Sequence, residues 1–156
     1  MAEDKYTVER SATIAAPPAR IYEELVDFHR WTTWSPWEDL DPQLQRTYSG
    51  PESGVGAVYA WSGNRKAGKG QMAIREATEP SKVGIDLEFV KPFKASNDTV
   101  FTIEPEGSGS RVTWTLTGKK TAMTKVMGIF TSMDKMVGPD FEKGLARLKA
   151  VTETAR

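Results

Sequence analysis

Between Gln45 and Thr117 the sequence holds six short segments in which apolar and polar residues alternate, separated by turn residues and with no helical pattern among them. Alternation with a period of two is typical of strands that bury one face. Strands that follow one another at this spacing, with no helix to cross over, favour an antiparallel meander. The expected strands are Gln45–Tyr48, Ala57–Ser62, Lys69–Thr78, Lys82–Val90, Asn97–Ile103 and Arg111–Thr117.

The residues before this series predict a seventh strand and two short helices. Residues 6–14 alternate in the same way, although Arg10 interrupts the apolar side. Pro18 is suited to the first turn of a helix, and the apolar spacing that follows predicts a short amphipathic helix ending near Phe28. A second short helix or turn then includes Trp31 and breaks at Pro36.

The last third of the chain changes to the three- and four-residue spacing of a helix. Met133–Val151 predicts an amphipathic helix of at least four turns, with a kink or an irregular first turn at Pro139. Ala122–Phe130 predicts a shorter helical stretch. The long helix is the element able to cover the apolar side of the sheet. We therefore expect a single α+β domain over residues 1–156, in which a curved antiparallel sheet of about seven strands grips the C-terminal helix around a mostly apolar cavity.

Composition and charge exclude several classes of function. The 156 residues contain 21 Lys and Arg and 21 Asp and Glu, so the zero net charge argues against a nucleic-acid partner. Cysteine is absent and His29 is the single histidine, which excludes disulfides and the usual zinc sites. No stretch approaches the roughly 18 apolar residues of a membrane span, and the charged start has no signal-peptide pattern. We expect a cytoplasmic protein without a metal or another cofactor.

Motifs along nearly the whole chain carry a family resemblance. The motifs are Ala16-Pro-Pro with Ile21-Tyr-Glu-Glu-Leu-Val-Asp-Phe, Trp31-x-x-Trp34-Ser-Pro-Trp37, Asp41-Pro42, Tyr59-Ala-Trp61-Ser-Gly-Asn64, Gly68-Lys-Gly70-Gln-Met72, Glu88-Phe89-x-Lys91-Pro92-Phe93, Val112-Thr-Trp114 and Asp140-Phe-Glu-Lys-Gly144-Leu. They resemble the START-like (SRPBCC) superfamily, in its bacterial polyketide cyclase/dehydrase-type subgroup, and this implies the helix-grip fold. The resemblance leaves the chemistry open, because that scaffold holds lipid carriers, hormone receptors, cyclases and chaperone-stimulating domains.

The candidate site is a cavity with an apolar wall. Five tryptophans and six methionines offer wide and adaptable apolar surface, and small-molecule sites are largely apolar with a few orienting polar groups. Each of these side chains has the plain core as its alternative. The expected wall residues are Trp37, Tyr59, Trp61, Met72, Ile74, Phe89, Phe93, Phe101, Trp114, Met133, Met136 and Phe141.

A few polar residues are candidates to orient a ligand. Tyr59 ranks first, because it shares the side of its strand with Trp61. Arg10 either extends to water near an edge or points into the interior, where it meets an acid or a ligand. His29 is interpreted as a solvated histidine at a helix end, with a pocket acid or base as the alternative. The full set of orienting candidates is Arg10, Tyr59, Glu88, Asn97 and Thr99, of which Glu88 falls on the polar side of its strand.

Three functions remain open from the sequence. The first is binding of an apolar or aromatic small molecule, lipid- or polyketide-like, in the internal cavity. The second is a polyketide cyclase or dehydratase-type enzyme, in which the shape of the cavity accelerates cyclisation by holding reacting atoms close. The third is a chaperone-stimulating interaction domain, which predicts an exposed docking patch. A monomer and a homodimer both fit the sequence.

Overall fold

Seven strands form one antiparallel sheet in the part of the chain that the structure describes. The computed structural model describes residues 5–35, 41, 43–64, 68–91, 95–119 and 133–154. In the order β1-β7-β6-β5-β4-β3-β2, the strands β2 to β7 form the meander that the alternating pattern predicted, and β1 pairs with β7. The strands are β1 (Lys5–Ile14), β2 (Gln45–Ser49), β3 (Val58–Ser62), β4 (Lys69–Thr78), β5 (Lys82–Lys91), β6 (Ala95–Glu106) and β7 (Gly109–Lys119).

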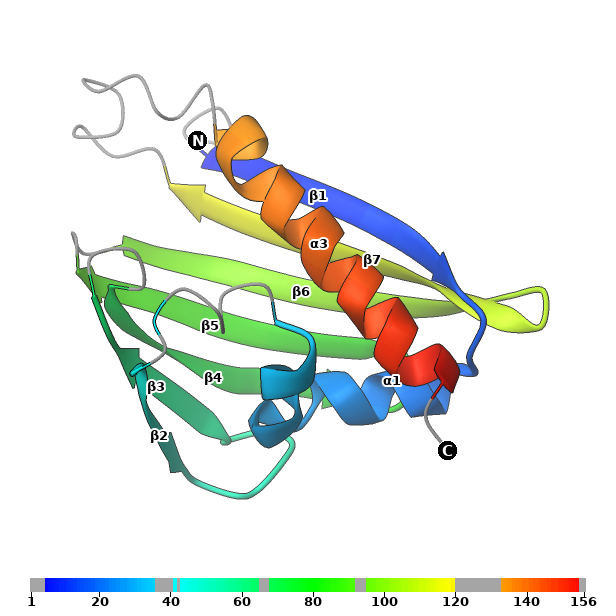
Figure 1. Ribbon diagram of the computed structural model, residues 1–156, viewed down its shortest axis with the longest axis horizontal. Coiled ribbons are helices and arrows are strands. Elements are labelled where there is room, and N and C mark those ends of the chain that lie inside the picture. Colours follow the sequence, from blue (N-terminus) through cyan, green and yellow to red (C-terminus); the bar gives the residue numbers. More distant parts are fainter. Residues whose placement is uncertain are drawn as a thin grey trace.

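One long helix, α3 (Met133–Thr154), lies across one face of this curved sheet (Figure 1). Helix α3 contacts β1, and the short helices α1 (Pro18–Leu25) and η2 (Phe28–Thr33) lie close to its C-terminal half (Figure 1). The helix is continuous through Pro139. These features confirm the α+β helix-grip architecture, whereas the predicted stretch Ala122–Phe130 lies outside the described residues.

The first short helix ends earlier than the sequence predicted. Helix α1 stops at Leu25, and Asp27 has an extended backbone with φ −124° and ψ 108°. The Asp27 carboxylate accepts the backbone N–H of His29 and thereby caps the 3₁₀ helix η2. The capping preference of Asp27 therefore divides one predicted helix into two elements, with Phe28 starting the second one.

A buried carboxylate ties the two short helices together. The Glu24 carboxylate lies 2.6 Å from Nη1 of Arg20 and 3.1 Å from Nη1 of Arg30, so a cation from α1 and a cation from η2 share it. The backbone carbonyl of Glu24 also accepts a hydrogen bond from Nε1 of Trp34. Because a buried charge is tolerated only when it is paired, these contacts fix η2 against α1.

Aromatic side chains fill the space where α3 meets the sheet. The rings of Trp114 on β7 and Phe141 on α3 stack with centroids 4.0 Å apart and an interplanar angle of 4°. Trp34 packs edge-on against Trp114, and it packs in the same way against Phe101. Trp31 and Trp34 are fully buried, so these two tryptophans belong to the core, as the sequence interpretation favoured.

Candidate functional site

The side chains on the inner face of the sheet become more exposed toward the end of the strands that carries Trp61 and Phe89. Trp61, Leu87 and Phe89 point to the inner face and are only partly buried. They lie close together on the sheet, because Gly70 on β4 pairs with Trp61 on β3 and with Phe89 on β5. In the next row toward the core, Met72 pairs with Leu87. Apolar side chains left partly exposed on a concave face are suitable contacts for a ligand.

Gly70 gives Trp61 its position on this face. A Cβ atom at Gly70 would lie 2.8 Å from Cη2 of Trp61 and would collide with the carbonyl oxygen of Glu88. The indole therefore lies directly over the backbone of β4, and its edge meets the ring of Phe89 with centroids 5.8 Å apart. The glycine in the Gly68-Lys-Gly70 motif is thus required by the contact with Trp61.

Two buried polar side chains lie on the same inner face. Asn97 and Thr99 on β6 are both buried, with Leu87 paired to Asn97, and with Ile85 and Leu116 on either side of Thr99. The hydroxyl oxygen of Thr99 has no hydrogen-bond partner among the described residues. Buried hydroxyl groups nearly always have a partner, so the lack of one at Thr99 requires an explanation.

Arg10 meets an acid on α3. Its Nε atom lies 2.8 Å from Oε2 of Glu142, and its Nη1 donates to the carbonyl oxygen of Glu9. The guanidinium crosses α3 at Gly138, where a Cβ atom would collide with it. Arg10 is therefore directed from the sheet to α3, and the acid that it meets is Glu142.

The sequence-predicted site residues fall into three groups. The buried residues in the core are Ile74, Phe101, Trp114 and Phe141. Tyr59 and Met72 are also buried, one row nearer the end of the strands that carries Trp61 and Phe89. Trp61 and Phe89 are partly buried, and Glu88 is exposed on the outer face. Ligand contact by any of them stays a prediction. Trp37, Phe93 and the side chains of Met133 and Met136 lie outside the described residues.

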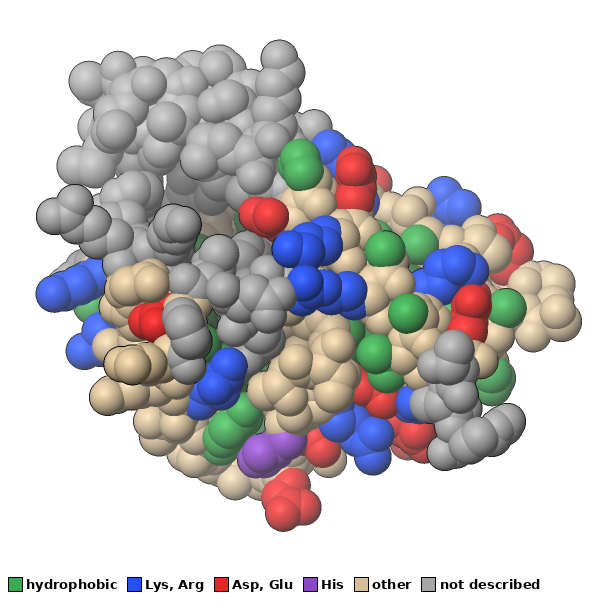
Figure 2. Space-filling model, viewed as in Figure 1, with side chains coloured by type: hydrophobic (Ala, Val, Ile, Leu, Met, Phe, Trp, Pro, Cys, Tyr) green, Lys and Arg blue, Asp and Glu red, His purple; other side chains and the backbone are tan. Residues whose placement is uncertain are grey.

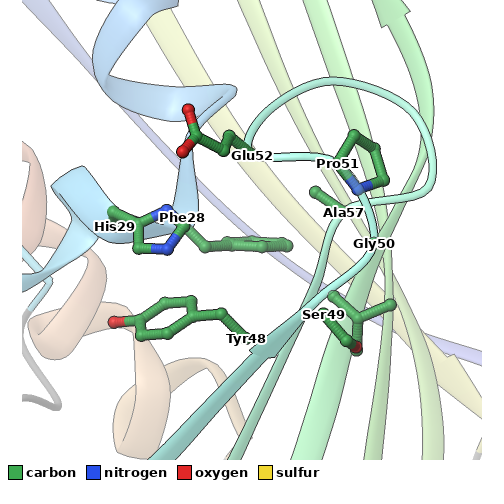
Figure 3. Close-up of a pocket in the computed structure, with 9 residues that line it drawn as sticks. Phe28, His29, Tyr48, Ser49, Gly50, Pro51, Glu52 and Ala57 are labelled. Carbon is green, nitrogen blue, oxygen red and sulfur yellow. The ribbon is translucent and has the colours of Figure 1, made fainter.

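A small cleft at the β2 edge was not predicted as a site. It has a volume of about 160 Å³ and lies between η2 and the β2–β3 connection (Figure 3). His29 lines it, stacked on Tyr48 with ring centroids 4.1 Å apart and an interplanar angle of 22°. Tyr48 stacks in turn on the buried ring of Tyr59. The other residues that line the cleft are Phe28, Ser49, Gly50, Pro51, Glu52, Ala57 and Val58.

His29 lies at a helix end, as the favoured interpretation expected, whereas a role as acid or base stays a prediction. Its side chain is 48% exposed at the start of η2, as expected for a solvated histidine. The ring nitrogen Nδ1 nevertheless lies 2.9 Å from Oδ1 of Asp27, and the ring forms a wall of the cleft. The stack on Tyr48 was not visible in the sequence, because the two residues come from different elements.

Charges of both signs are spread over the face that carries α3 (Figure 2). Two clear pKa shifts belong to residues of α1 and α3. Burial, and then the Glu79 carboxylate, raise the pKa of Tyr22, and a hydrogen bond from Lys149 is the main cause that lowers the pKa of Glu153. Among the described residues, no group of three or more His, Asp or Glu side chains is placed to hold a metal ion. No described helix is long and apolar enough to cross a membrane.

Comparison with known proteins identifies the family. A family model described as "Polyketide cyclase / dehydrase and lipid transport" matches residues 5–153. The chain belongs to this family, as the sequence motifs indicated. No curated protein matches the sequence.

Solved structures share the fold at low sequence identity. Protein CV1439 from Chromobacterium violaceum has a TM-score of 0.70 and 15% identity, over 96% of this chain and 99% of that chain. The Aha1 dimer from Colwellia psychrerythraea has a TM-score of 0.61 and 16% identity, over 95% and 96% of the two chains. DynU16, described as a putative protein in the dynemicin biosynthetic locus, has a TM-score of 0.64 and 13% identity, over 95% and 47% of the two chains.

Proposed function

We propose that the protein binds an apolar or aromatic small molecule on the inner face of the sheet, against Trp61, Leu87 and Phe89. The ligand is lipid- or polyketide-like, with a ring or chain that covers these side chains. Its polar group meets the hydroxyl of Thr99. A cytoplasmic location and the choice between monomer and homodimer remain predictions.

The unpartnered hydroxyl of Thr99 is the observation that carries this proposal. A buried hydroxyl without a hydrogen bond costs roughly 1–3 kcal/mol of stability, which a purely structural position has no reason to retain. A ligand with one hydroxyl or carbonyl group would provide the missing partner. The strand neighbours of Thr99, Ile85 and Leu116, are apolar and buried, so they provide no partner for its hydroxyl.

The family supports the same class of ligand. Its description joins polyketide cyclases and dehydrases with lipid transport, and all three involve molecules with large apolar parts. The cyclase or dehydratase alternative uses the same inner face and differs only in that the ligand is changed while bound.

The chaperone-stimulating alternative is one of the functions that this scaffold holds. That alternative predicts a continuous exposed patch. In the described part of the chain, the exposed large apolar side chains are Val55, in the β2–β3 connection, and Val90, on β5. These two belong to different elements, so the inner face remains the better supported site.

Isothermal titration with naphthol and with decanol tests the binding proposal. We expect Trp61→Ala to weaken binding by about 10- to 100-fold, since burying an aromatic or aliphatic side chain contributes roughly 1.5–3 kcal/mol. The matched control is Val90→Ala, on the outer face of β5, which should leave the affinity unchanged.

Native mass spectrometry of the protein purified from its own cells completes the test. A retained small molecule of unchanged structure supports binding, and a chemically altered one supports the enzyme. If the protein carries nothing and neither naphthol nor decanol binds, the proposal is wrong.

A further inference from the structure

Two independent contacts hold the imidazole of His29 in one orientation. The ring nitrogen Nδ1 lies 2.9 Å from Oδ1 of Asp27, and the same oxygen accepts the backbone N–H of His29. On its face, the ring stacks on Tyr48. A carboxylate oxygen only accepts hydrogen bonds, so Nδ1 carries the proton and Nε2 keeps its lone pair. A histidine that is merely solvated would need neither contact.

The cleft beside this ring has the size of a one-ring molecule. Its volume of about 160 Å³ is close to the ~150 Å³ of cavities known to hold benzene. Gly50 shapes the opposite wall, because its φ is +76° and a Cβ atom there would collide with the carbonyl oxygen of Gly56. Glu52, from the same connection, extends toward His29 in the close-up (Figure 3).

We propose that the Asp27–His29 pair is a general base for a small, neutral, planar molecule with a weakly acidic C–H or O–H proton. Nε2 takes the proton, the Asp27 carboxylate stabilises the imidazolium, and Nε2 returns the proton to the product. The carboxylates of Asp27 and Glu52 disfavour an anionic occupant. This site lies at the β2 edge and is separate from the inner-face site of the proposed function.

Charged side chains of both signs lie near the imidazole of His29. Asp27 pairs with His29 and lies 3.9 Å from Nε of Arg30, which belongs to η2 as well. Arg30 also pairs with Glu24 of α1, and Glu52 faces the ring from the β2–β3 connection. Asp27 is therefore a positioning residue held by a neighbouring cation, and His29 is the group that meets the substrate.

Ring opening of nitrobenzisoxazole tests the base directly. In this reaction a base removes the ring C–H proton, and the electron pair forms a nitrile as the N–O bond breaks. The single product is a coloured cyano-nitrophenolate, and the imidazolium then gives its proton to water. We expect the protein to exceed the same concentration of free imidazole by about tenfold or more. His29→Gln should abolish this excess, and Asp27→Asn should reduce it by about tenfold, because it removes the charge that stabilises the imidazolium.

Two controls make the result specific. Asp86→Asn removes an exposed carboxylate of the outer face, at a pair with Arg75, and should leave the rate unchanged. Diethylpyrocarbonate modification of the unmutated protein should also abolish the excess, because His29 is the single histidine. A rate equal to that of free imidazole, or an unchanged rate in His29→Gln, overturns the proposal.

Nitrogen NMR of histidine-labelled protein gives a readout that does not depend on any substrate. The single histidine yields one assigned pair of ring signals, and we expect the neutral ring to carry its proton on Nδ1. A histidine side chain surrounded by water has no fixed hydrogen-bond acceptor at Nδ1. A neutral ring with the proton on Nε2 would contradict the proposal, whatever the kinetics show.

Discussion

The substitution Thr99→Val should stabilise the protein while it weakens ligand binding. Thr99 is 4% exposed, and its hydroxyl oxygen has no partner among the described residues. Removing an unpaired buried hydroxyl in favour of a methyl group relieves part of a desolvation penalty of roughly 1–3 kcal/mol. We therefore expect the free energy of unfolding to rise by about 1 kcal/mol, which corresponds to an increase of about 2–4 °C in Tm for a chain of this size.

Thr152→Val is the matched control for this experiment. Thr152 is also 4% exposed, but its hydroxyl donates to the carbonyl oxygen of Leu148 over 2.8 Å. Losing a satisfied hydrogen bond should lower the free energy of unfolding by about 0.5–1.5 kcal/mol. The two substitutions remove the same atom at equal exposure, so they should have opposite signs.

Urea and thermal unfolding, followed by circular dichroism, measure both changes, and titration with naphthol measures the effect on binding. Thr99→Val should weaken naphthol binding by about 3- to 10-fold, because one hydrogen bond contributes roughly 0.5–1.5 kcal/mol. The reasoning is refuted if Thr99→Val destabilises the protein as much as Thr152→Val does. That outcome would mean that the Thr99 hydroxyl already has a partner without a ligand.

Two further predictions concern α3. Phe141→Ala should lower the free energy of unfolding by about 3–5 kcal/mol in urea, because it removes the ring stacked on Trp114; a loss below about 1 kcal/mol would contradict this packing. For Glu153, hydrogen bonds from Lys149 and from the backbone N–H of Ala15 lower the pKa of the carboxyl in the folded state. The contribution of this carboxylate to the free energy of unfolding is therefore present above the ordinary pKa of 4.5, and it is lost as the pH falls through the lower folded pKa. The stability difference between the unmutated protein and Glu153→Gln should shrink over that acidic range, and a difference independent of pH would show that these hydrogen bonds do not favour the charged form.

The sheet and α3 were predictable because they depend on local periodicity. Alternation along each strand fixes which side chains share a face, so the inward positions of Tyr59 and Trp61 could be predicted without knowing their neighbours. The ends were less predictable: β6 extends through Pro105 to Glu106, where pairing with β7 at the hairpin continues the strand beyond the alternating segment. At Asp27, the apolar spacing favours continuing α1 to Phe28, whereas the carboxylate favours capping η2, and the cap prevails.

The functional details depend on contacts between distant segments, and the sequence carried little signal for them. Arg10 broke the apolar pattern of β1, but only the fold brings Glu142 to it. The buried position of Thr99 followed from its side of the strand, whereas its missing partner depends on the side chains across the sheet. Likewise His29 gained its place beside Tyr48 through the packing of η2 on the β2 edge.

The pairing of β1 with β7 has a consequence for how the chain reaches this structure. The salt bridge between Arg10 and Glu142 joins residues 132 positions apart, and β1 forms its ladder with β7 alone, at the end of the meander. Closing so large a loop is slow, because its entropy is lost before any contact compensates for it. The β2–β7 meander has mainly neighbouring contacts and can form first, so the arrival of β1 and the docking of α3 on it should be one late, cooperative folding event.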